Sequence, residues 1–272
     1  MPNNQIGFDE SLQPRISFSL LFDLLIQIDF KRQVRLAKEA LEMHRVVGFL
    51  VQGEPETGQE VLVNRLLRLI PRWQNTSPIK VDVTHRAIGR NSRYLLQTLA
   101  SYFRLPKDAK PNQIKYKICE LWQNQNVIFI FDKVDYMSPE VLSAWLQEFW
   151  QPLVEMTRIN KPQVNTYLLM FLVDYSGSVN EPNLLLAESP NQFEFPNLPL
   201  KLPPTARFTL DILNDWIENI TYMQIAPAYL TDDLIPEVLL EKTEDGIPEL
   251  VYEEICNHFG CSWEGDLARW LI

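Results

Sequence analysis

Short apolar runs alternate with amphipathic segments along most of the chain, and this alternation predicts the fold. The apolar runs, such as "VVGFLV" and "VIFIF", resemble strands that are buried on both faces of a sheet. The predicted strands cover residues 46–51, 79–84, 126–135, 166–175 and 199–203. Between them, apolar residues recur at intervals of three and four, and the predicted helices cover residues 30–45, 59–70, 92–103, 112–123 and 138–156. Alternating strands and helices predict a three-layer α/β fold, a parallel sheet with helices on both faces.

The pattern changes after residue 204, where short helical segments follow one another without a further strand. Thr209, Thr231 and Ser262 are their candidate N-caps. We therefore predict an N-terminal segment at 1–29, an α/β core at 30–204 and a C-terminal helical domain, lid-like or winged-helix-like, at 205–272. Within the first segment, "ISFSLLFDLLIQIDF" is compatible with either a strand or a helix.

Composition narrows the class of protein. The chain is 46% hydrophobic and holds seven Trp and fourteen Phe, which is ample for a packed core. No apolar run approaches the roughly 18–20 residues that span a bilayer, so no membrane contact is expected. Cys256, His258 and Cys261 lie close together, but their spacing is not that of a zinc finger, and core packing is the simpler interpretation. The absence of a signal-peptide pattern and of a disulfide framework leads us to expect a cytoplasmic location.

The net charge of −10 is unevenly distributed. Residues 1–136 hold 19 Lys and Arg against 14 Asp and Glu, whereas residues 137–272 hold 6 against 21. An acidic half of this kind argues against nucleic acid as a partner, because phosphate contacts require Lys and Arg. Basic helices in the first half leave a nucleic-acid-binding module as a minor alternative. Their cations are Arg86, Arg90, Arg93, Arg104, Lys107, Lys110, Lys115 and Lys117.

"GEPETGQE", at residues 53–60, has the outline of a phosphate-binding loop between a strand and a helix. The spacing Gly53-x-x-x-x-Gly58 fits, but Gln59 stands where the phosphate-binding lysine should be. Glu60 replaces the Ser or Thr that would hold magnesium. Glu54, Glu56 and Glu60 would each repel a triphosphate, by about 1 kcal/mol at 4 Å in water and about 4 at a dielectric of 20. We therefore predict that the site is lost, that Glu60 takes the electrostatic position of a phosphate at the helix N-terminus, and that the loop caps itself.

The second half of such a site follows the strand "VIFIFD". Asp132 lies where a magnesium-binding carboxylate would, and Asp135 lies where a carboxylate could activate water. Lys133 is a candidate to neutralise them, and both carboxylates could also simply face water at the end of the strand. An alternative is a divergent nucleotide-binding switch or weak ATPase that uses Glu60, Asp132 and Asp135 around a metal.

In their order along the chain, the segments "GFLVQGEPETGQEVLVNRLL", "VIFIFDKVD", "YLLMFLVDY" and "EDGIPELVYEEI" resemble a STAND-type NTPase. In that family a Gly-x-Pro turn of the helical part meets the nucleotide, and Gly246-Ile247-Pro248 matches it. Without the lysine, the chain is more similar to the inactive STAND domains of bacterial conflict and signalling systems. The resemblance implies a P-loop NTPase-like three-layer parallel sheet with a C-terminal helical domain. It also implies a pseudo-NTPase without catalytic residues, metal or ATP/magnesium cofactor, acting through protein partners such as an effector or an adaptor-domain protein. The residues of the degenerate nucleotide site are then Gly53, Pro55, Thr57, Gly58, Gln59, Glu60, Asp132, Asp135 and Pro248. Residual ATP or GTP binding, the oligomeric state and the signal sensed stay open.

Overall fold

A single parallel sheet forms the centre of the computed structural model, which describes residues 16–84, 91–162, 164–179, 185–222 and 234–272. Its strand order is β2-β3-β4-β1-β5, and all neighbouring strands are parallel. The strands are β1 (Val46–Gln52), β2 (Ile79–Asp82), β3 (Val127–Asp132), β4 (Leu168–Asp174) and β5 (Leu200–Lys201). Each overlaps a predicted strand, so the α/β fold with a parallel sheet is confirmed.

The register of the strands brings the ends of β1, β3 and β4 to one edge of the sheet. β1 pairs with β4 from Val46 opposite Leu168 to Gln52 opposite Asp174. On the other side of β4, Asp132 at the end of β3 lies opposite Val173. Because the phosphate-like loop follows β1 and Asp132 closes β3, the topology places both halves of the predicted site at this edge.

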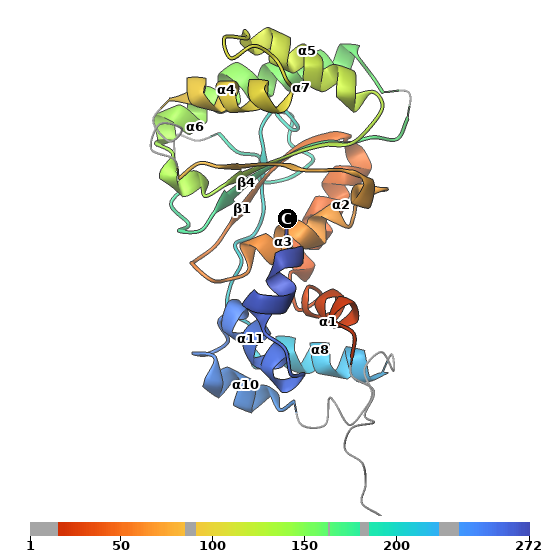
Figure 1. Ribbon diagram of the computed structural model, residues 1–272, viewed down its shortest axis with the longest axis vertical. Helices are drawn as coiled ribbons and strands as arrows, with labels where there is room; N and C mark the ends of the chain where they lie inside the picture. The colour runs from red at the N-terminus through yellow and green to blue at the C-terminus, as the bar shows by residue number, and fades with distance from the viewer. Residues whose placement is uncertain (1–15, 85–90, 163, 180–184, 223–233) are drawn as a thin grey trace, which may run out of the picture.

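Helices cover both faces of the sheet (Figure 1). Neighbouring residues of β1 face opposite ways, since Phe49 belongs to one hydrophobic cluster and Leu50 to the other. The helices packed against Leu50's face are α4 (Ser92–Tyr102), α5 (Pro111–Trp122), α6 (Pro139–Trp145) and α7 (Gln151–Ile159). Those on Phe49's face are α2 (Lys31–Met43) and α3 (Gln59–Leu67). Short 3-10 helices are η2 (Trp73–Asn75) and η3 (Val134–Tyr136).

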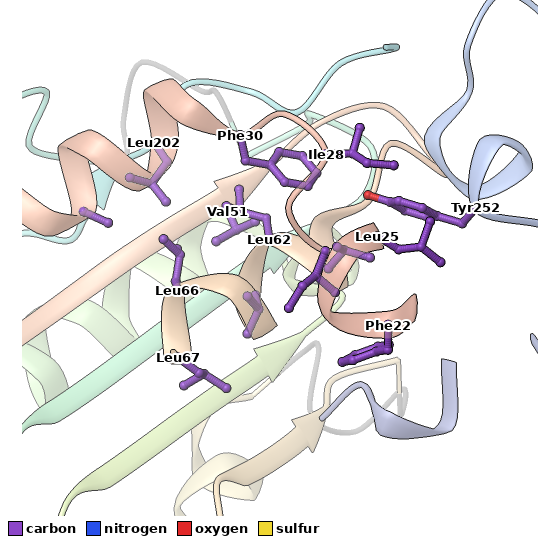
Figure 2. Close-up of a cluster of buried hydrophobic side chains, with 14 of the residues drawn as sticks. Phe22, Leu25, Ile28, Phe30, Val51, Leu62, Leu66, Leu67, Leu202 and Tyr252 are labelled. Carbon is purple, nitrogen blue, oxygen red and sulfur yellow. The ribbon is translucent and has the colours of Figure 1, made fainter. Parts of the chain in front are cut away.

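The C-terminal helices pack against α1 and α3 rather than against the sheet (Figure 1). Figure 2 shows Tyr252 beside Leu25, Ile28 and Phe30, all within one hydrophobic cluster that extends to Val51 of β1. The ambiguous first segment thus contains a helix, and its packing is continuous with both the core and the C-terminal helices. These elements are α1 (Phe18–Leu25), α8 (Leu210–Tyr222), α10 (Pro236–Lys242), α11 (Pro248–His258), η5 (Trp263–Leu267) and η6 (Ala268–Trp270). The domain boundaries at 29/30 and 204/205 stay predictions.

Several local predictions can be compared with the described residues. Ser262 Oγ accepts a hydrogen bond from the Gly265 N–H at 3.2 Å and is an N-cap as predicted. Thr209 Oγ1 accepts one from the Ile212 N–H at 3.4 Å, at the start of α8, while Thr231 lies outside the described residues. Cys256 and Cys261 are buried, which confirms core packing. None of the helices described combines the length and apolar character needed to cross a membrane.

The helix predicted over 138–156 is interrupted by a wide turn. η4 (Leu146–Trp150) is a π-helical segment between α6 and α7. Pro152 is the second residue after this segment; it has no N–H to donate, and its ring would clash with the carbonyl four residues earlier in an α-helix. Widening the preceding turn removes this clash.

Candidate functional site

The loop after β1 packs tightly against the residues that follow β5. The Thr57 and Thr205 hydroxyls are 2.7 Å apart, and Gly53 forms a parallel bridge with Thr205. A Cβ atom on Gly53 would lie 2.0 Å from Thr205 Oγ1 and 2.6 Å from Thr57 Oγ1. Close packing within the protein is therefore sufficient to explain the glycine at position 53.

Gln59 occupies the lysine position and folds back onto the loop. Its side chain is 1% exposed, and its Nε2 donates to the Glu54 carbonyl oxygen at 2.7 Å. Thr57 Oγ1 donates to the same oxygen, also at 2.7 Å. Both bonds close the loop on itself, whereas Pro55 stays exposed at its tip. The side chain at position 59 thus stabilises the loop, without bringing a charge to it.

Glu60, in the first turn of α3, takes part in a network across the sheet edge. Its Oε1 lies 3.3 Å from Lys80 Nζ and 3.1 Å from the Tyr175 hydroxyl, which donates to Asp132 Oδ1 at 2.9 Å. Lys80 Nζ is 3.8 Å from Asp132 Oδ2 and donates to the carbonyl of Ile272 at 3.2 Å. The positive charge between the two carboxylates therefore comes from Lys80.

Two predictions about these charges hold only in part. Glu60 lies in the first turn of α3, as predicted, but the N-cap is Gly58, which has no side-chain hydrogen bond, and the Glu60 carboxylate is paired with Lys80. Lys133 was the candidate to neutralise Asp132 and Asp135, and its charge lowers the pKa of both carboxyls, but the ion pair with Asp132 is made by Lys80.

Burial sets the protonation of this network. It raises the pKa of Asp132, while Lys80 and the hydrogen bond from Tyr175 lower it and so limit the rise. Burial and the neighbouring carboxylates of Glu60 and Asp132 raise the pKa of Tyr175 far above its usual range. The phenol therefore stays protonated and can donate to either carboxylate.

Asp135 contacts the residue that follows β4. Its Oδ1 accepts a hydrogen bond from the Tyr175 backbone N–H at 3.4 Å, and burial raises its pKa. Among the described residues, no group of three or more His, Cys, Asp or Glu side chains is placed to hold a metal ion. The alternative arrangement of Glu60, Asp132 and Asp135 around a metal is therefore not assembled in this structure.

The Gly-x-Pro turn lies directly on the loop. Pro248, the first residue of α11, approaches within 3.6 Å of the position of a Cβ on Gly58, and the Glu249 N–H donates to the Glu56 carbonyl at 3.3 Å. Burial, followed by the charges of Glu56, Glu60 and Glu264, raises the pKa of Glu249. The start of α11 thus adds negative charge to a loop that is already acidic.

A family model described as inactive STAND matches residues 25–173, more than half of the 272 residues. The chain belongs to the inactive STAND family. The comparison with curated proteins finds no match. The part of the chain that the family model matches contains the loop, Lys80 and Asp132, whereas Thr205 and Pro248 lie beyond it.

Solved structures with a similar fold include ATPases and replication proteins. The Walker-type ATPase PABY2304 of Pyrococcus abyssi has a TM-score of 0.46 and 15% identity, over 89% of this chain and 72% of that one. Cdc6p from Pyrobaculum aerophilum has a TM-score of 0.45 and 11% identity, over 90% and 66% of the two chains. Domain III of the replication initiation protein DnaA of Thermotoga maritima has a TM-score of 0.41 and 12% identity, over 90% and 89%.

The residues of this inactive STAND chain do not fit a magnesium nucleotide. A triphosphate needs a cation at the loop and a hydroxyl for the metal. Gln59 supplies neither, and its amide is hydrogen-bonded to the Glu54 carbonyl. Glu60 has no hydroxyl, and its carboxylate is paired with Lys80. Carboxylates of Glu56 and Glu249 add repulsion.

Sequence reasoning found the loop residues but missed their partners. Gly53, Thr57, Gln59, Glu60 and Asp132 are indeed brought to one sheet edge, with Pro248 on Gly58. The partners Lys80, Tyr175 and Thr205 come from β2 and from the segments after β4 and β5. Tyr175 and Thr205 lie at or just after the end of a predicted strand, which is their only signal, whereas Lys80 is the second residue of the predicted strand 79–84 and carries no signal of this kind. Arg207, at the start of the helical part, donates to the Glu244 carbonyl.

Proposed function

We propose that this chain is a catalytically inactive regulatory or scaffold module that acts through contacts with protein partners, in a bacterial effector-coupled conflict or signalling system. The observation that carries the proposal is the Lys80 ammonium, which lies 3.3 Å from Glu60 and 3.8 Å from Asp132. A protein side chain thus supplies the charge that a metal would supply in a working site. Membership of the inactive STAND family supports the same interpretation.

A module without catalytic activity would act through its surface, by binding protein partners. Large apolar side chains are exposed, among them Phe193 at 97% and Ile159 at 85%. Exposed side chains of this size are common at protein interfaces, especially when they gather on one side. Phe193 lies two residues before Phe195 and Ile159 follows Arg158, and both Phe195 and Arg158 line one cavity near the start of β1.

We expect no thermal stabilisation by nucleotides. A ligand at 100 times its dissociation constant adds about 2.7 kcal/mol to the free energy of unfolding, which shifts the melting temperature of a chain of this size by a few degrees. Thermal unfolding with and without millimolar ATP, GTP or ADP and magnesium should show no such shift. The physical reason is the acidic loop and the internally paired Glu60.

The double variant Gln59→Lys, Glu60→Thr is the informative companion. It restores the two side chains of a working loop, but Lys80 still lies beside Asp132, where magnesium would bind, and the carboxylates of Glu56 and Glu249 still repel phosphate. We therefore expect no shift of the melting temperature in this variant either. A shift in the double variant alone would show that the side chains at positions 59 and 60 are the whole difference. A shift in the natural protein would contradict the proposal and support the nucleotide-binding switch.

A further inference from the structure

A second site lies at the opposite edge of the sheet, where β1 and β4 begin. It is an open cavity of about 620 Å³, between the end of α2, the end of α7 and the segment around Phe195. This volume falls within the range of about 300–1,000 Å³ that is typical of small-molecule sites. None of the residues of the degenerate nucleotide site lines it.

The charged side chains that line this cavity are all basic. Arg45, Arg158 and Lys161 contribute cations, His44 lies among them, and none of the lining residues is Asp or Glu. The whole chain has a net charge of −10, so this cavity carries the opposite sign of charge to the rest of the molecule. A concave surface with one sign of charge attracts ligands of the opposite sign.

The cations are held in place without being fully neutralised. Arg45 stacks on the Tyr167 ring at 4.6 Å and also donates to its hydroxyl. Arg158 forms an exposed ion pair with Glu155 at 3.4 Å and donates to Asn197 at 3.0 Å. Exposed pairs of this kind are weak and leave the cation able to bind another anion.

A buried donor without a partner adds an independent observation. Trp122 lines the cavity and is 2% exposed, and its indole N–H has no hydrogen-bond partner among the described residues. An indole N–H can only donate, so a group that satisfies it must be an acceptor. A carboxylate or phosphate oxygen is an acceptor that the surrounding cations also favour.

The rest of the lining is apolar. Val46 and Val154 are buried, and Phe195 and Pro196 form another side, with the Phe195 ring 4.9 Å from that of His44. Met43 and Val164, about half exposed, also line the cavity. An anion alone would leave this apolar surface in contact with water, whereas an anion that carries an apolar group would cover it.

We propose that this cavity binds an organic anion, a carboxylate or phosphate attached to an apolar body, with the anion at Arg45, Arg158, Lys161 and the Trp122 N–H. A free small molecule or an acidic side chain next to an apolar one in a protein segment would provide the same chemistry. The site lies at the other end of the strands from the loop after β1, so the proposal is independent of whether a nucleotide binds there.

Calorimetric titration of the full chain tests the anion requirement. The probes are 3-phenylpropionate, phenyl phosphate and the peptide acetyl-Glu-Phe-amide, each compared with an uncharged counterpart, 3-phenylpropionamide, phenol and acetyl-Gln-Phe-amide. We expect at least one anion to bind about tenfold or more tightly than its neutral counterpart, because the neutral probe loses a hydrogen bond between charged groups. Binding of a small anion indicates a free ligand, and binding of the peptide alone indicates a protein segment.

The variant Trp122→Phe keeps an aromatic ring and removes the unpartnered N–H. It should weaken binding of the anion about tenfold. No hydrogen bond within the protein is lost, but the smaller ring leaves a void that lowers the melting temperature, so binding is compared with that of a control that carries the same loss of volume. Trp145→Phe is the control: its buried N–H also has no partner among the described residues, but it does not line the cavity, so affinity should not change.

Two further readouts complete the test. Lys161 is exposed, and Lys161→Gln should weaken binding of the anionic probe without changing the affinity for its neutral counterpart. Burial and the nearby Arg158 lower the pKa of His44 in the free protein, and a bound anion should raise it, as followed by NMR. Equal affinity for the charged and neutral probes, binding of none of them, or unchanged affinity in Trp122→Phe would overturn the proposal.

Discussion

Replacement of Gly246 by alanine is expected to destabilise the protein by about 2–5 kcal/mol, the sum of a backbone and a steric cost. Gly246 has a φ of +85°, which costs a residue with a Cβ about 1–2 kcal/mol. The added Cβ would also lie 2.2 Å from the Phe208 carbonyl oxygen and 2.9 Å from Leu240 Cδ2. The Gly246 carbonyl accepts from the Phe208 N–H at 2.8 Å, so neither backbone segment can move away without loss of that bond.

Gly260→Ala is the matched control for this variant. Gly260 has a similar φ of +73°, but a Cβ there would meet nothing within 4 Å. Only the backbone cost of about 1–2 kcal/mol should remain. Urea denaturation of both variants measures the difference. Equal losses would contradict the packing argument and leave Gly246 with no structural role beyond its backbone conformation.

The outcome bears on why a Gly-x-Pro turn persists in an inactive STAND chain. Gly246 allows the turn to contact Phe208, and Pro248 then packs on Gly58 of the loop. Contacts within the protein are thus sufficient to require both residues. A motif that resembles a nucleotide-contacting turn has here a packing role that the sequence motif alone does not reveal.

Local periodicity predicted most of the fold. "VIFIFD" and "LLMFLVD" are apolar almost throughout because β3 and β4 are covered by helices on both faces. The order of the strands was not predicted, since pairing between β1 and β4 joins residues more than a hundred positions apart. α1 was ambiguous because most of its apolar surface is buried by distant helices, which weakens the amphipathic signal.

The site was predicted less completely than the fold. Gln59 alone indicated that the phosphate loop had lost its lysine, because that position follows from spacing. Lys80 lies within β2, and only the sheet register shows that its side chain reaches Glu60 and Asp132. Lys133 is nearer in sequence, but its backbone has a φ of +61° and it makes no ion pair among the described residues.

Substitution Lys80→Met should destabilise the protein at neutral pH by about 1–3 kcal/mol, the usual cost of leaving a buried polar or charged group without its partner. Asp132 would keep its hydrogen bond from Tyr175 and the weaker effect of the Lys133 charge, but it would lose its ion pair with Lys80, and so would Glu60. Since Lys80 lowers the pKa of Asp132, its removal should raise that pKa further above the unfolded value. Urea denaturation at several pH values measures both effects.

The sign of the pH dependence follows from proton binding. Between the unfolded and the folded pKa of Asp132, the folded state holds more protons, so the free energy of unfolding falls as the pH rises through that window. The variant widens the window, and its deficit should therefore be largest at neutral pH and shrink as the pH falls toward about 4, where the carboxyl is protonated. Lys38→Met is the control, because Lys38 pairs with Glu42 at 3.9 Å on the exposed surface of α2, where a loss of about 0.5 kcal/mol without this pH dependence is expected. If Lys80→Met behaves like this control, the ammonium does not hold the sheet edge together, and the charge of Lys80 cannot carry the stability argued here.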